Sequence, residues 1–268
     1  MAASLGKLFC REVKLEDESV LKVQQCEIGD VGCVVWDAAL VLAKFLELAA
    51  GKSANNSQQP ATSKFCDVTL QNKTVVELGA GTGIVGIMAG ILGADVRITD
   101  LQQFVPLMEL NIKENAERIK GSVKASTLKW GEDITPFLPH PDYIIFSDCI
   151  YYEESLQPLI ETISALAGNH TVVLWSYEER AMGHKQKKKP RLQQRFFEAI
   201  TKDFTVEEVP QDSLHAVYRS EDIHVLRMER KSQNNDQKHL RLEHATSATF
   251  KYGMTYETKH TISDVPDH

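Results

Sequence analysis

The sequence predicts an α/β protein with a Rossmann-like, seven-stranded sheet, and three observations support that fold class. Strand-like and helix-like segments alternate from residue 75 to residue 202. The first of these strands runs directly into the glycine-rich loop Gly79-Ala80-Gly81-Thr82-Gly83. No helix-like segment separates the last two strands. The alternation predicts parallel βαβ units with helices on both faces of the sheet, and the missing helix predicts an antiparallel last strand.

The segments before the glycine loop predict an N-terminal β element, one helix and one loop. Residues 20–27 are strand-like, and residues 36–50 carry apolar side chains at helical spacing up to Gly51. Residues 52–63 are rich in Asn, Gln, Ser and Ala, which predicts a flexible surface loop.

The remaining elements follow from short apolar runs and their spacing. We expect strands at residues 75–78, 96–99, 123–128, 143–146, 171–176, 205–209 and 223–228, and helices at residues 84–92, 104–119, 156–166 and 195–202. Residues 231–268 are polar without a sustained apolar period, which predicts a poorly ordered tail. The folded domain therefore spans residues 1–230.

Composition excludes several classes of protein. The chain has 268 residues, 43% of them apolar, and a net charge of −7, which argues against a general nucleic-acid binder. No apolar run approaches the ~20 residues that span a bilayer, and we see no secretory signal. The five cysteines are scattered without a Cys-x-x-Cys pair, so neither a metal site nor a disulfide framework is indicated. A cytosolic setting is the default expectation.

The glycine loop fits two classes of cofactor. Residues 81–86 match the dinucleotide fingerprint GxGxxG, and residues 79–83 match the tighter GxGxG loop of S-adenosylmethionine enzymes. Asp100 ends the next strand, where an acid binds ribose hydroxyls in both classes, although it could also cap a following helix. Glu77 favours S-adenosylmethionine, because a carboxylate beside the loop would repel a pyrophosphate. A glycine turn without any ligand is the remaining alternative.

A second group of polar residues, Ser147 to Tyr152, follows the apolar strand 143–146. Ligands of doubly wound sheets lie beyond the carboxyl ends of the strands, so this segment is expected to line the same cleft. Asp148 and Tyr151 could hold a cationic amine near a methyl donor, with the acid accepting a proton and the ring stabilising the cation. Alternatively, Asp148 caps a helix near Glu153 and Tyr151 packs.

Two tryptophans stand near these motifs. Trp36 follows the apolar run 31–35, and Trp130 follows a predicted strand, where an adenine could stack on its ring. Tryptophans in such positions are more often core residues than ligand contacts.

Four motifs occur together and in order, at residues 35–39 (Val-Trp-Asp-Ala-Ala), 77–83, 128–131 (Leu-Lys-Trp-Gly) and 148–152 (Asp-Cys-Ile-Tyr-Tyr). This set resembles the seven-β-strand protein-lysine methyltransferases of the methyltransferase-like 21 group. The resemblance covers roughly residues 20–230. It is strongest, at residues 31–37, 148–156 and 218–224, to members that methylate the AAA-type ATPase chaperone valosin-containing protein.

The resemblance implies the cofactor, the substrate and the roles of individual residues. S-adenosylmethionine would contact Trp36, Glu77, Gly79, Ala80, Gly81, Asp100, Trp130, Ser147 and Tyr152. Asp148 and Tyr151 would form the lysine channel. The product would be a methylated, and by the resemblance trimethylated, lysine on a folded AAA ATPase chaperone. The family implies a cytoplasmic protein without a metal, and we expect a monomer that binds neither nucleic acid nor membrane.

Three alternatives stay open at this point. One is a methyltransferase for another protein or for nucleic acid, although the Asn-Pro-Pro-Tyr motif common in amino-methylating nucleic-acid enzymes is absent at residues 148–151. Another is a NAD(P)-binding oxidoreductase, which Glu77 disfavours. The third is a non-catalytic binding module. The basic stretch 185–191 predicts a solvated loop, or else a patch for an acidic partner or for nuclear import.

Overall fold

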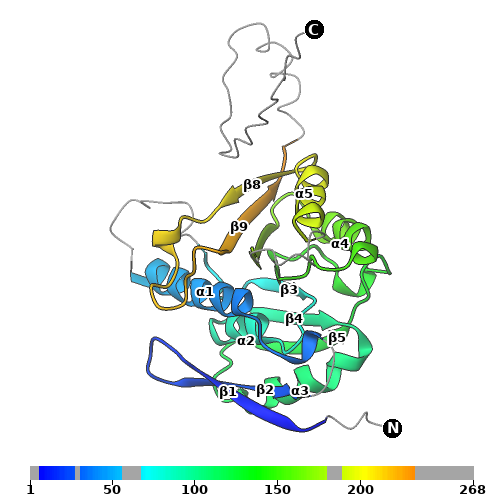
Figure 1. Ribbon diagram of the computed structural model, residues 1–268. Coiled ribbons are helices and arrows are strands. Elements are labelled where there is room, and N and C mark those ends of the chain that lie inside the picture. The colour runs from blue at the N-terminus through cyan, green and yellow to red at the C-terminus, as the bar shows by residue number, and fades with distance from the viewer. Residues whose placement is uncertain (1–5, 28–30, 56–67, 180–188, 233–268) are drawn as a thin grey trace, which may run out of the picture. The chain divides into compact units, whose positions relative to one another are not determined.

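The fold is built around one mixed β-sheet (Figure 1). The structure, a computed structural model, describes residues 6–27, 31–55, 68–179 and 189–232. Three predicted features lie outside these residues, namely positions 56–63 of the loop, 185–188 of the basic stretch and 233–268 of the tail.

The sheet has seven strands in the order β5-β4-β3-β6-β7-β9-β8. Strands β3 to β7 are mutually parallel, whereas β9 lies between β7 and β8 and is antiparallel to both. This confirms the predicted fold class, including the reversed last strand. The strands are β3 Thr74–Leu78, β4 Asp95–Asp100, β5 Ser122–Thr127, β6 Tyr143–Ser147, β7 Val172–Glu178, β8 Phe204–Glu208 and β9 Ile223–Arg230.

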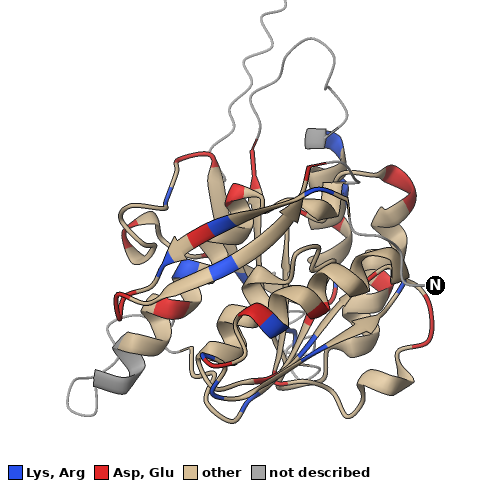
Figure 2. Cartoon of the chain, turned by 90° about the horizontal axis from the view of Figure 1, so that it is seen from below, with Lys and Arg blue, Asp and Glu red and all other residues tan. Residues whose placement is uncertain are grey.

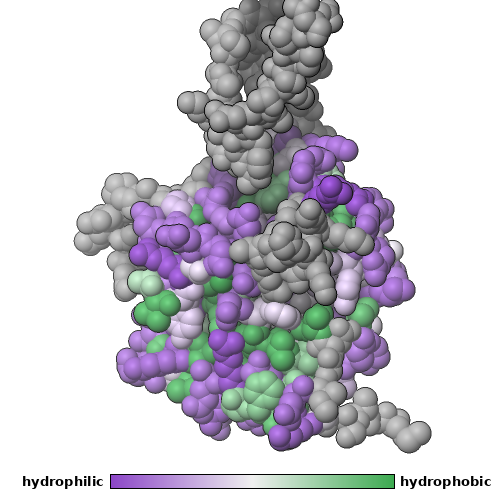
Figure 3. Space-filling model, viewed as in Figure 1, coloured by the Kyte–Doolittle hydropathy of each residue, from purple (hydrophilic) through white to green (hydrophobic). Residues whose placement is uncertain are grey.

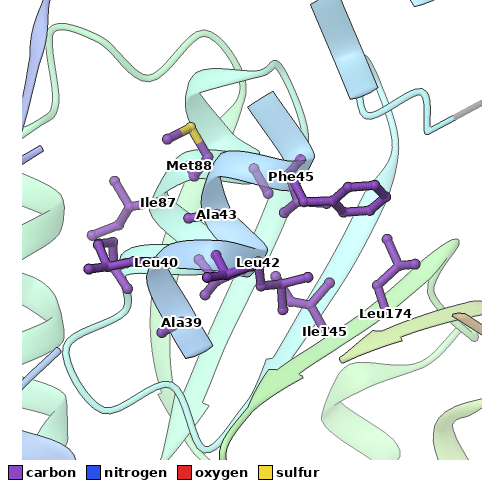
Figure 4. Close-up of a cluster of buried hydrophobic side chains, with 14 of the residues drawn as sticks. Ala39, Leu40, Leu42, Ala43, Phe45, Ile87, Met88, Ile145 and Leu174 are labelled. Atoms are coloured by element: carbon purple, nitrogen blue, oxygen red, sulfur yellow. The ribbon is translucent and has the colours of Figure 1, made fainter. Parts of the chain in front are cut away.

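Alternating side chains of the strands divide the core into two layers. Val75, Ile145 and Leu174 face one layer, which contains α1 Asp37–Asn55, α2 Ile84–Ile91 and α3 Val105–Glu114. Figure 4 shows Leu42 and Phe45 of α1, and Met88 of α2, in this layer. Neighbouring strand residues face the other layer, which contains α4 Glu153–Leu166 and α5 Lys189–Ile200. Helices therefore cover both faces of the sheet, as predicted.

A separate two-stranded hairpin precedes the sheet. Its strands, β1 Leu8–Lys14 and β2 Val20–Cys26, pair antiparallel. Only the second strand was expected from the sequence. Asn111 of α3 binds the outer edge of β2 by accepting from the Gln24 N–H at 2.7 Å and donating to the Gln24 carbonyl at 3.0 Å. Asn115 does the same at Lys22, at 3.1 and 2.7 Å. Two side-chain amides thus form the hydrogen bonds that a third strand would form with the edge of β2.

Several helix boundaries differ from the prediction. Helix α1 continues to Asn55, so the predicted loop is wrong for residues 52–55. Helix α3 ends at Glu114 because Asn115, a poor helix former, turns its amide to β2. Helix α4 begins at Glu153, where two acidic residues favour the helix N-terminus. Helix α5 begins at residue 189, so the predicted loop is also wrong for residues 189–191.

Polar and apolar residues are distributed as in a folded α/β domain. Figure 2 shows acidic and basic residues interspersed around the described elements. On the face shown in Figure 3, apolar residues gather in the lower half between polar margins. None of the helices in the described ranges combines the length and the apolar composition that a membrane crossing requires.

Candidate active site

The glycine loop is enclosed from two sides at the carboxyl end of β3. Gly79, Gly81 and Gly83 have φ values of 62°, 54° and 81°, in the left-handed region that favours glycine. A Cβ on Gly79 would lie 2.7 Å from Sγ of Cys149 and 2.8 Å from Cζ2 of Trp130, and a Cβ on Gly81 would lie 2.7 Å from the Gly32 carbonyl oxygen. Neither Gly79 nor Gly81 could therefore carry a side chain in this conformation.

Asp100 ties the end of β4 to this loop. Its Oδ2 accepts a hydrogen bond of 2.7 Å from the Gly81 N–H, and its Oδ1 accepts one of 2.7 Å from the Leu101 N–H. Leu101 is the N-cap of the following 3-10 helix, and among the described residues no side chain caps that helix. The alternative in which Asp100 caps a helix is therefore wrong, whereas its contact with a ribose stays a prediction.

Glu77 lies beneath the loop rather than at its surface. Only 1% of the residue is exposed, and its Oε2 accepts a hydrogen bond of 2.8 Å from the Gly86 N–H. Burial raises the pKa of this carboxyl to about 8, with the Gly86 N–H opposing the shift and the charge of Asp100 adding to it. The carboxyl is mostly neutral at neutral pH, so its charge offers no argument about the ligand. Direct cofactor contact by Glu77 stays a prediction.

One tryptophan lies beside the glycine loop, and the other is bonded to the segment that packs against it. Trp130 lies beside Gly79, as the close approach of its ring shows. Trp36 follows the 3-10 helix Val31–Cys33 and donates from Nε1 to the Val31 carbonyl at 2.9 Å. That segment places Gly32 against Gly81. Both tryptophans are half-buried, and Trp130 packs against the buried cluster that includes Leu78 and Phe146. Contact of either ring with a ligand stays a prediction.

Asp148 follows β6 in a strained backbone conformation. Its φ is +50°, a left-handed value that Asp tolerates better than most residues. Its N–H donates to the Ser176 carbonyl at 2.8 Å, and the buried Ser176 hydroxyl donates to the Ala38 carbonyl at 2.7 Å. Ser147, one residue earlier, is half-buried and pairs with Ser176 in the sheet. The chain from β6 is thus bonded to β7 and, through it, to the start of α1.

The alternative in which Asp148 caps α4 is wrong. The N-cap of α4 is Tyr152, and within the described chain no side chain forms a capping hydrogen bond there. Tyr151 and Tyr152 are 39% and 47% exposed, with ring centroids 4.5 Å apart. Tyr151 therefore does not pack in the core, and the contacts of both rings with a ligand or a substrate stay predictions.

Cys149 is a packing residue of the site. Its buried thiol contacts Gly79, and burial, reinforced by the charges of Asp100 and Asp148, raises its pKa well above the ordinary value. A thiol that stays protonated is a poor nucleophile. In the described ranges, no three His, Cys, Asp or Glu side chains are grouped so that they could hold a metal ion.

Two residues of the site were not found from the sequence. Asn111, fully buried, donates from Nδ2 to the Thr82 carbonyl at 2.9 Å and so holds the glycine loop as well as β2. Ser176 joins Asp148 to α1. The sequence offers only weak indications of either role. Asn111 and Asn115 lie one helical turn apart, and Ser176 is a polar residue in an apolar strand.

Comparisons with known proteins identify the class of enzyme. A family model described as "Lysine methyltransferase" matches residues 15–203. The protein N-lysine methyltransferase METTL21A of Danio rerio is 36% identical over 77% of this chain and 81% of its own length. The corresponding values are 31%, 77% and 81% for METTL21A of Mus musculus, and 30%, 76% and 83% for the protein-lysine N-methyltransferase EFM6 of Saccharomyces cerevisiae.

A comparison with solved structures confirms the fold. The 16S rRNA methyltransferase RsmC of T. Thermophilus aligns with a TM-score of 0.55 at 15% identity, over 86% of this chain and 53% of its own. That likeness shows the fold alone. The family match and the sequence relatives together establish more: the chain belongs to the lysine methyltransferase family, as a METTL21-group protein-lysine methyltransferase that uses S-adenosylmethionine.

Proposed function

We propose that this enzyme methylates a lysine of the AAA-type ATPase chaperone valosin-containing protein. The support is the resemblance of residues 31–37, 148–156 and 218–224 to enzymes that act on that chaperone. These segments are distant in sequence but adjacent in the fold. Asp37 and Tyr218 line one cavity, and Ser176 bonds both to Asp148 and to Ala38, the residue after Asp37. This convergence is the single observation that carries the proposal.

The cofactor site in this proposal is the glycine loop, with Trp130 beside it and Trp36 bonded to the segment that packs against it. Gly79, Ala80 and Gly81 would present backbone to the methionine portion of the cofactor, because a side chain at Gly79 or Gly81 has no space. Asp100 would bind the ribose hydroxyls from the end of β4. The remaining contacts would come from Trp36, Trp130, Ser147 and Tyr152, and Glu77 would act by holding the loop from beneath.

The catalytic roles fall to Asp148 and Tyr151. S-adenosylmethionine supplies an electrophilic methyl group on a sulfonium, and the attacking lysine must be neutral. Removing a proton from a lysine of pKa ~10.4 costs about 4–5 kcal/mol at pH 7. Asp148 would accept a hydrogen bond from the amine and assist that proton's departure, and the Tyr151 ring would stabilise the cationic product. The backbone bond from Asp148 to Ser176 would hold the acid in line with the methyl group.

The test is methyl transfer to purified valosin-containing protein with radiolabelled S-adenosylmethionine, followed by mass spectrometry of the modified lysine. We expect one trimethylated lysine with the wild-type enzyme and strongly reduced methylation with Asp148→Asn. A wild-type enzyme that labels other proteins of a cell lysate but not this chaperone would refute the substrate and retain the enzyme class. A cytoplasmic location and a monomeric state belong to the same proposal, and fractionation and sedimentation test them.

A further inference from the structure

A cavity of about 270 Å³ opens next to the candidate active site. It lies between the start of α1, the end of β7, β1 and the loop that precedes β9. Its apolar lining includes Leu40 and Ile223, both nearly fully buried, together with Tyr218 and the highly exposed Val217. The cavity therefore has an apolar wall that is open to solvent on one side.

Carboxylates dominate the polar lining of this cavity. Asp37, Glu178 and Asp222 contribute three acids, against a single cation, Arg11, among the described lining residues. Arg11 pairs with one of these acids, Asp37, at 3.5 Å and donates to the Val35 carbonyl at 3.3 Å, so the acids of the lining still outnumber its cation by two. Glu178 and Asp222 come from other elements, β7 and the loop before β9. A negative cavity with apolar walls complements a long cationic side chain, whose methylene stem packs while its charged head meets carboxylates.

Strand β7 carries residues of both the candidate active site and this cavity. Ser176, which accepts the Asp148 N–H, faces α1 and donates to the Ala38 carbonyl. Glu178 lies two residues further along the strand, hence on the same face and about 7 Å beyond Ser176. Asp37 directly follows Trp36 at the other wall. A peptide whose lysine reaches Asp148 would therefore carry its neighbouring residues past this cavity, since an extended chain advances about 3.3–3.6 Å per residue.

We propose that this cavity is a docking pocket for an arginine or lysine side chain of the substrate protein, close to the lysine that is methylated. The inference rests on the proposed position of the lysine channel at Asp148. The pocket selects substrates in which a second basic residue lies beside the target, and it disfavours acidic neighbours through like-charge repulsion.

Peptide binding tests the pocket without methyl transfer. The probe is a fluorescein-labelled peptide, Ala-Arg-Ala-Arg-Lys-Arg-Ala-Arg-Ala, titrated into protein saturated with S-adenosylhomocysteine, and a peptide with Gln in place of each Arg is its reference. We expect the Arg peptide to bind the wild type more tightly than the Gln peptide. The double variant Glu178→Gln with Asp222→Asn should weaken Arg-peptide binding by at least about fivefold.

The matched control removes two acids elsewhere, Glu109→Gln with Glu117→Gln, from exposed positions in and just after α3. It should bind within about twofold of the wild type, because distant exposed charges contribute little. Val217→Lys places a cation at an 80% exposed position of the pocket and should weaken binding without disturbing the core. Equal affinity of the wild type for both peptides, or wild-type affinity in both pocket variants, would overturn the proposal.

The two assays can refute the docking pocket and the proposed substrate independently of each other. Methylation of valosin-containing protein together with unselective peptide binding would refute the pocket alone. Selective peptide binding without methylation of that chaperone would refute the chaperone as substrate and leave the pocket in place.

Discussion

The Gly86 N–H donates a hydrogen bond of 2.8 Å to Oε2 of Glu77, which joins β3 to the first turn of α2 across the base of the glycine loop. The Thr99 hydroxyl donates to the Glu77 carbonyl at 2.5 Å and joins β4 to the same residue. Glu77 is thus the point at which two strands and one helix are bonded beneath the cofactor loop.

Glu77 makes the stability of this enzyme depend on pH. Its pKa is raised from 4.5 to about 8 in the folded protein, so the folded state holds a proton that the unfolded state releases. The stabilisation is complete below the unfolded pKa and is lost as pH rises through the folded pKa. We expect the free energy of unfolding to fall by about 2–3 kcal/mol more in the wild type than in Glu77→Gln between about pH 6 and about pH 9.

Urea unfolding of both proteins at matched pH values measures this difference. The Gln variant is the appropriate control because it retains the acceptor for the Gly86 N–H and removes only the titration. Parallel pH profiles of the two proteins would contradict the assignment of a neutral, buried Glu77.

The left-handed conformation of Gly81 predicts a loss of cofactor binding in Gly81→Ala. The new Cβ would lie 2.7 Å from the Gly32 carbonyl oxygen, and a φ of 54° is strained for alanine. We expect S-adenosylhomocysteine affinity, measured by calorimetry, to fall by at least about tenfold.

Gly51→Ala is the matched control for that substitution. Gly51 lies in α1, and a Cβ there meets no atom within 4 Å. The control should retain cofactor affinity and gain up to about 1 kcal/mol of stability, because alanine is the better helix former. Equal affinities of the two variants would refute the role of the loop.

Asp148→Asn should separate catalysis from cofactor binding. Asparagine tolerates the left-handed backbone and preserves the N–H that bonds to Ser176, so only the charge is lost. We expect kcat to fall by about 10²–10³-fold, with S-adenosylhomocysteine affinity nearly unchanged. Single-turnover methyl transfer measures the first quantity and calorimetry the second. A kcat within about threefold of the wild type would exclude Asp148 from the chemical step.

Ser176→Ala should weaken the alignment of Asp148 with α1. The substitution removes the 2.7 Å hydrogen bond to the Ala38 carbonyl, so we expect a loss of about 0.5–1.5 kcal/mol of stability. We also expect a several-fold lower kcat, since the strand that holds Asp148 loses its tie to α1. Ser164→Ala on α4 controls for the loss of a hydroxyl. A purely structural role for Ser176 would lower stability and leave kcat unchanged.

The sequence predicted the sheet because its central strands β3, β6 and β7 carry apolar residues that are recognisable in the local sequence. It also predicted which segments meet, since Gly79, Asp100 and Ser147 each end or follow a parallel strand, and parallel strands share one carboxyl edge. The charge of Glu77 was misjudged because its pKa depends on burial, which one strand does not reveal.

The residues that were missed depend on contacts across long sequence separations. Strand β1 is mostly exposed and carries little apolar alternation, so its pairing with β2 decides its structure. Asn111 acts on Gln24, and Ser176 on Ala38, each across many intervening residues. Helix propensity and strand periodicity describe neighbours in sequence and therefore say nothing of such bonds.

The amides of Asn111 and Asn115 have a consequence for association between molecules. A strand edge with free N–H and carbonyl groups is a template for pairing with another chain. Here the outer edge of β2 is occupied at Gln24 and Lys22 by side chains that cannot extend a sheet further. Loss of either amide would expose that edge to β-pairing with a second molecule. The same two asparagines therefore close this edge to strand pairing, and Asn111 does so with the amide that also holds the glycine loop.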